Sequence, residues 1–343
     1  MAENFFSLTP EDQKEALLQA SSNLGRPAYL LEKDLWVVWT LGKLFSAPAG
    51  DHLTFKGGTS LSKVYRLIDR FSEDIDLTYD IRQILPEAES EIPPSSSQAR
   101  KWSSKARALL PGWIDESVVP LLSDALRADN MAAELSRDED KLYLHYRPCT
   151  LANDYVMPRV LLEFGARSSG EPHGRQHVCC DMAAAQLDGV LFPEATPIVM
   201  DVARTFWEKA TAAHVYCVQQ RLKSERFARH WHDLNAIVQS QRFAEVIDRR
   251  DIAALVAEHK SWFFSEKAAD GSNVDYHHAV SGNLRLVPSG EARAHLETDY
   301  AKMLEGGMFD STPPSFDVLM TACAELEERL NTAAHTPAPI TLN

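Results

Sequence analysis

The sequence has no apolar stretch of the roughly 18 residues that a membrane-spanning helix needs, and it has no amino-terminal basic region, apolar run and cleavage site. We therefore expect a cytoplasmic protein with no membrane partner. Cysteine is also scarce: the 343 residues include five, at scattered positions without a C-x-x-C spacing. This pattern predicts reduced thiols and argues against a disulfide framework or a zinc site.

Basic residues are outnumbered, with 35 Lys and Arg against 49 Asp and Glu, a formal net charge of -14. Because non-specific affinity for nucleic acid comes mainly from cations that neutralise phosphates, this balance excludes a protein whose whole surface binds nucleic acid, and no DNA partner is expected. A local basic groove is still compatible with it. The composition, 45% apolar and 24% charged, is that of a globular protein.

The order of the predicted elements indicates an α+β fold. Helices are expected over residues 10–24 and from about residue 27, because Thr9 can cap the first, Pro10 can begin it and Gly25 can end it. Strands and helices then mix up to about residue 200, and the segment 86–100, rich in Pro, Ser and Glu, is expected to be a surface loop. From residue 204 the periodicity is helical. We predict two domains, 1–203 and 204–343, the second a helical lobe.

The stretch FKGGTSLSK, residues 55–63, predicts a strand, a glycine turn and a helix. Such a turn exposes backbone N–H groups at a positive helix end, and its glycines let an anion approach closely. Phosphate is the natural guest, although a tight turn needs glycines with no ligand at all. The full spacing of a P-loop is absent, so a P-loop ATPase is not supported. The predicted nucleotide-binding residues are Lys56, Gly57, Gly58, Thr59 and Ser60.

Two acids follow in SEDIDLTYD. Asp74 and Asp76 are two residues apart, so on a strand both side chains point to one face while Ile75 and Leu77 point to the other. Neighbouring carboxylates repel each other, and Mg²⁺ (or Mn²⁺) suits such a pair because it takes one or two carboxylates and completes its shell with water and phosphate oxygens. An acidic strand edge that only discourages aggregation is the alternative. With the glycine turn, the pair predicts a metal-dependent site for a nucleoside triphosphate and nucleotidyl transfer.

The segment FKGGTSLSKVYRLIDRFSEDIDL resembles the signature of the AbiEii/AbiGii toxin family of nucleotidyltransferases, in the DNA polymerase beta-like superfamily. EKDLWVVWTLGKLF, RTFWEKATAAHV, RFARHWHDLNAIV and DYAKMLEGGMF resemble family segments in the same order. The resemblance implies a minimal nucleotidyltransferase mixed-sheet core with N-terminal helices and a helical C-terminal lobe. It also implies a toxin of a toxin–antitoxin or phage-abortive system, a cognate antitoxin encoded beside it, and transfer of a nucleotide to RNA, notably the 3′ end of tRNA.

By the same resemblance, Lys209 matches the family lysine and Asp233 matches the late acid of the fourth motif. Lys209 is expected to hold the triphosphate, although a solvated helix lysine is the alternative. Asp233 is expected either to orient Lys209 or Arg229, or to act as a base for the acceptor hydroxyl. Arg229 is included among the predicted nucleotide-binding residues.

A third acid is common in this superfamily, on a strand beside the pair. Glu163 is the candidate, because its apolar neighbours suggest a buried strand in which a lone carboxylate needs a partner. It is either a metal ligand or the partner of Arg167 or Arg159 in a salt bridge. Lys63, in contrast, is interpreted as a residue of the helix surface.

Three functions are open at this stage. The leading one is nucleotidyl transfer to RNA. A second is transfer to a protein hydroxyl or a small molecule, which the acidic net charge permits. The third is a nucleotide-binding module without turnover, which would not require the acid pair and the lysine together.

Overall fold

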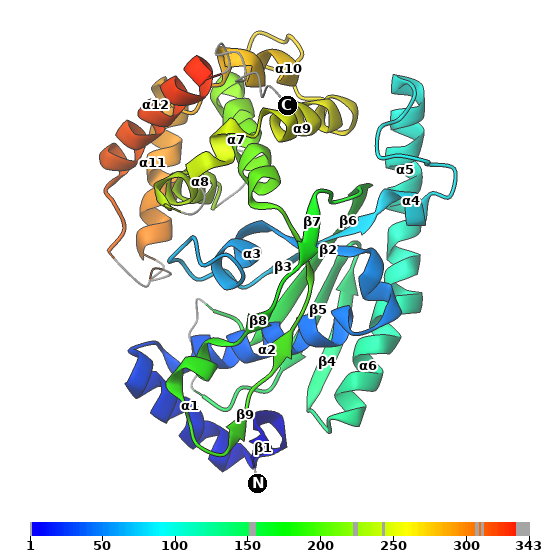
Figure 1. Ribbon diagram of the computed structural model, residues 1–343, viewed down its shortest axis with the longest axis vertical. Helices are drawn as coiled ribbons and strands as arrows, with labels where there is room; N and C mark the ends of the chain where they lie inside the picture. Colours follow the sequence, from blue (N-terminus) through cyan, green and yellow to red (C-terminus); the bar gives the residue numbers. More distant parts are fainter. Residues whose placement is uncertain are drawn as a thin grey trace, which may run out of the picture. The chain divides into compact units, whose positions relative to one another are not determined.

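The computed structural model describes residues 2–150, 156–221, 226–241, 244–305, 309 and 312–333 (Figure 1). The chain divides into two compact units. The N-terminal unit contains residues 1–66, 71–91 and 101–200, and the C-terminal unit contains residues 201–343 together with two short segments, 67–70 and 92–100. No helix in the described parts of the chain is both long and apolar enough to cross a membrane.

The centre of the N-terminal unit is a mixed seven-stranded sheet in the order β4-β5-β6-β3-β2-β11-β7. Strand β3 is parallel to β6 and β2 is parallel to β11, whereas the other neighbours are antiparallel. Its strands are β2 (Leu53–Lys56), β3 (Ile75–Asp80), β4 (Ala133–Asp138), β5 (Lys141–Tyr146), β6 (Arg159–Ser168), β7 (His173–Arg175) and β11 (Ile198–Met200). The predicted α+β class is confirmed, and its predicted strands before the glycine turn, at the acid pair and at Glu163 are β2, β3 and β6.

The two faces of this sheet differ in character. Residues alternate between buried and half-buried along β6, so one face is apolar and the other is polar. Helices cover the apolar face: Trp36 of α2 (Ala28–Phe45) stacks on Tyr146 at 5.0 Å between ring centroids, and Trp113 of α5 (Ser96–Trp113) stacks on Tyr79 at 3.9 Å. The polar face carries the acids that the sequence singled out.

The remaining elements of this unit are short or peripheral. Helix α1 (Pro10–Leu24) begins as predicted, with the Thr9 hydroxyl accepting from the Asp12 N–H at 3.2 Å, and ends at Gly25 with φ +66°. The others are α3 (Gly57–Lys63), α4 (Ile81–Ile84), α6 (Val119–Ala128), β1 (Glu3–Asn4), β8 (Val178–Cys179), β9 (Val190–Leu191) and β10 (Glu194–Ala195). Helices α5 and α6 follow one another along the chain and are joined by a π-helical turn at Ile114–Val118.

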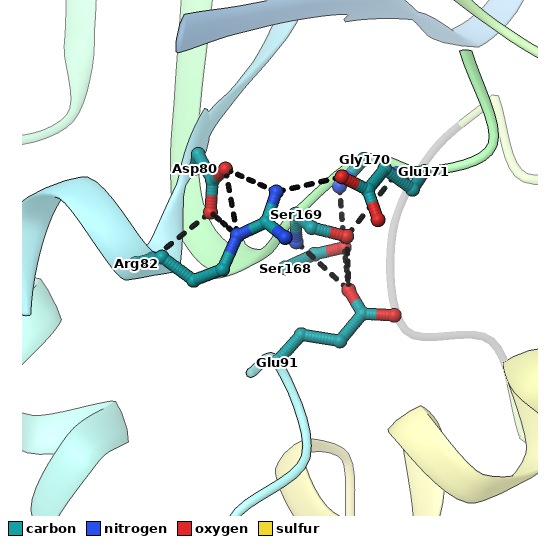
Figure 2. A network of polar contacts seen from close by, with 7 residues as sticks. All are labelled: Asp80, Arg82, Glu91, Ser168, Ser169, Gly170 and Glu171. Carbon is teal, nitrogen blue, oxygen red and sulfur yellow. Dashed lines mark hydrogen bonds and ion pairs between the residues drawn. The ribbon is translucent and has the colours of Figure 1, made fainter. Parts of the chain in front are cut away.

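The segment before α5 is fastened to the sheet by a polar network at the C-terminal ends of β3 and β6 (Figure 2). Glu91 is 8% exposed and accepts from the Ser169 N–H at 2.8 Å and from the Ser168 and Ser169 hydroxyls at 3.0 and 2.8 Å. Arg82 bridges Asp80 at 2.6 Å and Glu171 at 2.7 Å. The loop expected to lie wholly on the surface is therefore anchored by a buried carboxylate.

The C-terminal unit is helical, as expected from the periodicity after residue 204. Its main helices are α7 (Val202–Gln219), α8 (Arg229–Gln239), α9 (Arg250–Phe263), α10 (Tyr276–His278), α11 (Gly290–Glu305) and α12 (Phe316–Ala333). Its core contains Trp207 of α7 and Trp231 of α8, both fully buried, and the Trp231 indole N–H donates to the Leu286 carbonyl at 2.5 Å.

Candidate active site

Four charged residues form one row across the polar face of the sheet. Strand register places Lys56 of β2 opposite Asp76 of β3, Asp76 opposite Glu163 of β6, and Glu163 opposite Lys141 of β5. Directly opposed side chains in neighbouring strands are about 5 Å apart at Cβ. The sheet therefore brings together Lys56, Asp76 and Glu163, three residues that the sequence predicted separately. We call these four residues the charged row.

The carboxylate of Asp76 lies directly against Gly57. Gly57 has φ +79°, and a Cβ atom added there would lie 2.0 Å from Asp76 Oδ2 and 2.8 Å from its Cγ. Only glycine leaves room for the acid at this turn, and its left-handed backbone also favours glycine. The glycine turn is thus required by the neighbouring carboxylate, whatever else it binds.

The hydroxyls of Thr59 and Ser60 are used inside the protein. Both residues are fully buried. Thr59 Oγ1 donates to the Asp74 carbonyl at 2.5 Å and lies 3.0 Å from the Ser72 hydroxyl, while Ser60 Oγ donates to the Gly57 carbonyl at 2.9 Å. Thr59 and Ser60 were predicted to bind nucleotide, and in this structure their hydroxyls form hydrogen bonds within the protein. They fix the backbone that carries Asp74, and the backbone N–H groups of the turn are left as the predicted phosphate donors.

Glu163 is less buried than the sequence suggested, because only one face of β6 is covered. Its side chain is 38% exposed, and it forms a salt bridge with Lys141 Nζ at 2.6 Å, whereas the expected partners were Arg167 or Arg159. This hydrogen bond raises the pKa of Lys141. Glu163 nevertheless lies where a third acid was predicted, on the strand beside Asp76.

Two buried lysines form ion pairs that fasten helix α3 and the residue before Asp74 to other parts of the N-terminal unit. Lys33 Nζ of α2 lies 2.5 Å from Glu73, the residue before Asp74, and donates to the Met157 carbonyl at 3.1 Å. Lys63 Nζ, at the end of α3, lies 2.6 Å from Asp34 and 2.5 Å from Asp181.

The interpretation of Lys63 as a surface residue is therefore wrong. Its side chain is 9% exposed. Burial alone would lower the pKa of Lys63, but the carboxylates of Asp34 and Asp181 raise it, so the ammonium group stays charged. The error has a simple cause: the residue lies at the end of a short helix, and its partners are 29 and 118 positions away in the sequence.

In the C-terminal unit, Lys209 and Asp233 form a buried cluster with Arg70. Lys209 Nζ of α7 lies 2.9 Å from Asp233 Oδ2 of α8. Arg70 donates to both carboxylate oxygens, from Nε at 2.8 Å and from Nη2 at 2.7 Å. All three side chains are at most 10% exposed, and the cluster carries one net positive charge.

These contacts bear on the two roles considered for Asp233. Burial alone would raise the pKa of its carboxyl, but the Arg70 guanidinium and the Lys209 ammonium hold it well below its usual range. A carboxylate so stabilised is a weak base. The geometry matches the orienting role, and the residue oriented is Lys209, because the Arg229 Nε donates to the Arg226 carbonyl at 3.0 Å.

Sequence reasoning missed Arg70, Lys33 and Lys141. A signal existed for Arg70, because it lies four residues before Asp74 inside the signature segment and next to Phe71. Lys33 lies in a helix whose apolar spacing gave no reason to bury a charge, and the register that opposes Lys141 to Glu163 is a property of the folded sheet.

A divalent cation fits the acid pair by the chemistry of its oxygen donors. No group of three or more His, Cys, Asp or Glu side chains in the described residues is arranged to hold a metal ion. Mg²⁺, however, needs one or two carboxylates and takes its other ligands from water and phosphate. Asp74 and Asp76, both half-exposed at the start of β3, supply that number.

Comparison with known proteins gives a family match and distant structural neighbours. The family described as "Nucleotidyl transferase AbiEii toxin, Type IV TA system" matches residues 40–322. The nucleotidyltransferase toxin MenT4 from Mycobacterium tuberculosis H37Rv is 18% identical, with 96% of this chain and 98% of that chain covered and a TM-score of 0.42. JHP933 from Helicobacter pylori is 14% identical, with 88% and 95% covered and a TM-score of 0.28. No curated protein matches the sequence.

Proposed function

We propose that this chain, which belongs to the family of AbiEii nucleotidyltransferase toxins of type IV toxin–antitoxin systems, transfers a nucleoside monophosphate from a nucleoside triphosphate to the 3′ end of an RNA, with tRNA as the acceptor. The observation that carries the proposal is the charged row with the Asp76 carboxylate set against Gly57. A carboxylate fixed beside a glycine turn suits a metal-bound triphosphate. As a nucleotidyltransferase, the chain agrees with the activity predicted from its sequence.

Asp74 and Asp76 are the residues we assign to Mg²⁺ or Mn²⁺, with Glu163 as a third ligand. When bound, the metal supplies positive charge to the phosphates. To bind the metal, Glu163 would have to break its salt bridge with Lys141. The Glu163 side chain is 38% exposed, which leaves it room to move.

The reaction forms a bond between the acceptor 3′ oxygen and the α-phosphorus and breaks the bond from that phosphorus to the bridging oxygen, releasing pyrophosphate. The hydroxyl proton passes to water. We assign the triphosphate to the N–H groups of Gly57 and Gly58 and to the cations Lys56, Lys209 and Arg229. Asp233 holds Lys209 in place, and the lowered pKa of the Asp233 carboxyl argues against a role for Asp233 as the base.

The biological setting follows from the family. A type IV system implies a cognate antitoxin, which we expect to be encoded beside this chain, and a growth arrest that the antitoxin relieves. We place the reaction in the cytoplasm, where tRNA and nucleoside triphosphates are available, and the phage-abortive role is part of the same proposal.

The test is transfer of label from each of four α-labelled nucleoside triphosphates to total RNA, total protein and small hydroxylic acceptors. We expect label in RNA, and at least about a 100-fold loss for either variant, because Asp76→Asn removes a carboxylate assigned to the metal and Lys209→Ala removes a cation assigned to the triphosphate. Asp138→Asn on β4 and Lys302→Ala on α11 are matched controls that should retain activity and toxicity.

Other outcomes identify the alternatives. Label in protein or in a small molecule would move the chain to a different acceptor class. Triphosphate binding without pyrophosphate release would identify a non-catalytic nucleotide-binding module. Full toxicity of Asp76→Asn would contradict the mechanism itself.

A further inference from the structure

Beyond the charged row, the same polar face carries an aromatic residue flanked by a cation and an imidazole. Strand register places Tyr143 of β5 opposite Leu161 of β6 and His145 opposite Arg159. Tyr143 and Arg159 are half-buried, and His145 is exposed. The charged row does not use these three residues, which we call the stacking patch.

The planar groups of the stacking patch lie against one another. The Arg159 guanidinium carbon is 4.7 Å from the centroid of the Tyr143 ring, within the range of a cation–π contact. The His145 ring is stacked on Tyr143 with centroids 6.0 Å apart. Ser136 of β4 lies 2.8 Å from His145 Nε2, which fixes the imidazole ring in its orientation.

The guanidinium of Arg159 forms no salt bridge with a carboxylate of the part of the chain that the structure describes. Among the described residues no carboxylate lies within salt-bridge distance of its guanidinium, whereas Lys141, on the same face, is paired with Glu163 at 2.6 Å. A guanidinium that lies over a tyrosine ring offers a phosphate-binding charge and a flat surface together. In a chain of net charge -14, this local positive group marks where an anionic ligand is favoured.

We propose that the stacking patch binds the last unpaired nucleotides of the RNA acceptor, whose bases stack on Tyr143 and His145 while Arg159 contacts their backbone. The inference rests on the proposed function and adds where the acceptor lies. Aromatic and arginine planes are the usual contacts of unstacked RNA bases.

The distances along β6 fit such an acceptor. Glu163, Leu161 and Arg159 follow one another on one face, so Arg159 is about 13 Å along the strand from Glu163. That is the length of a few nucleotides. A single-stranded 3′ end lying on the patch would therefore bring its terminal hydroxyl to Asp76 and Glu163, whereas a blunt duplex end presents no unstacked base.

The test measures binding of an RNA hairpin with a four-nucleotide 3′ overhang, and of the same hairpin with a blunt end, by fluorescence anisotropy. Tyr143→Ala and Arg159→Ala should each raise Kd for the overhang by about 5- to 150-fold, the range for loss of one base stack, and leave the blunt hairpin unchanged. Tyr143→Phe keeps the ring and should bind normally. Arg293→Ala is the matched control, because its guanidinium also lies over an aromatic ring, 5.1 Å from Phe316.

Steady-state transfer to the overhang hairpin supplies a second readout, with KM raised by a similar factor and kcat within about twofold. Unchanged overhang affinity in folded Tyr143→Ala and Arg159→Ala would overturn the inference. So would loss of antitoxin binding with RNA affinity intact, which would assign the patch to a protein. If the wild type binds the overhang through the stacking patch but transfers no nucleotide to RNA, the result contradicts the proposed function and still supports RNA binding by the stacking patch.

Discussion

At the scale of single residues, the carboxylate of Asp76 occupies the space that a side chain at position 57 would need. Gly57→Ala introduces a Cβ that would lie 2.0 Å from Asp76 Oδ2, so the acid must move. A displacement of about 1 Å at a reacting group costs on the order of 100-fold in rate. We expect at least that loss in nucleotidyl transfer.

A variant at a second glycine, Gly189, distinguishes the effect of backbone strain from the effect of displacing the Asp76 carboxylate. Gly189 has φ +78°, but nothing lies within 4 Å of the Cβ that Ala would add. Gly189→Ala should lower the unfolding free energy measured in urea by about 1–2 kcal/mol, because Ala is strained at this backbone conformation. The backbone of Gly57→Ala should cost a similar amount. Gly189→Ala should nevertheless keep full activity. Equal activity of the two variants would contradict the role given to the close approach.

The buried cluster of Arg70, Lys209 and Asp233 makes a prediction from charge alone. Asp233→Asn removes the carboxylate that both buried cations contact, whereas Arg70→Met keeps the pair of Lys209 and Asp233. We expect Asp233→Asn to lower the unfolding free energy by about 3–5 kcal/mol and Arg70→Met by less. Chemical denaturation at pH 7 measures both.

The pH dependence follows from the lowered pKa of Asp233. A carboxyl whose folded pKa is depressed stabilises the protein above its unfolded pKa of about 4, and this contribution is lost as pH falls toward the folded value. The gap in stability between wild type and Asp233→Asn should thus be the same at pH 7 and pH 5 and narrow only below about pH 4. A gap that already changes between pH 7 and pH 5 would show that another group dominates.

At the scale of elements, helix α2 organises the N-terminal unit through three consecutive buried charges. Glu32 accepts from the Cys149 N–H at 2.6 Å, Lys33 pairs with Glu73, and Asp34 pairs with Lys63. Each holds a different segment, and two of these segments adjoin the acid pair. The helix thereby links the apolar core to the position of Asp74.

Lys33→Met should therefore affect both stability and rate. It removes the cation that lies 2.5 Å from the half-buried Glu73, so the unfolding free energy should fall by more than the roughly 1 kcal/mol of an exposed salt bridge, and it loosens the residue before Asp74, so kcat for transfer should fall. Lys43→Met on the same helix is the control, because its bridge to Asp129 is about one-third exposed and is worth at most about 1 kcal/mol. Urea unfolding and steady-state kinetics on both variants distinguish anchoring from general loss of a salt bridge.

Sequence patterns predicted these elements well where the signal was local. Thr9, Pro10 and Gly25 delimited α1, alternation identified the strand of the acid pair, and a short apolar run identified the strand of Glu163. The partners of buried charges were not predictable, because they depend on which distant segments the fold brings together. Lys63 was misread for that reason.

At the scale of the whole molecule, the residues assigned to chemistry belong to two units. The segment 67–70, with Arg70, belongs to the C-terminal unit although it precedes Asp74 by only a few residues. The predicted domain boundary at residues 203/204 could not place segment 67–70 in the C-terminal unit, because that assignment depends on contacts in the folded chain and the boundary was predicted from sequence patterns. The short segment 71–73 connects the cation of one unit to the acid pair of the other.

The net charge of -14 makes a final prediction about RNA affinity. A protein that binds RNA through a broad basic surface loses affinity steeply with salt, by about 0.7 in log K per log salt for each single-strand phosphate contacted. Here Arg159 and the stacked rings of Tyr143 and His145 are the proposed contacts, so the slope for the overhang hairpin should be only about -1 to -2. Titrations between 50 and about 300 mM KCl measure it. A slope near -5 would require about seven phosphate contacts and would place the acceptor on a basic surface other than the stacking patch.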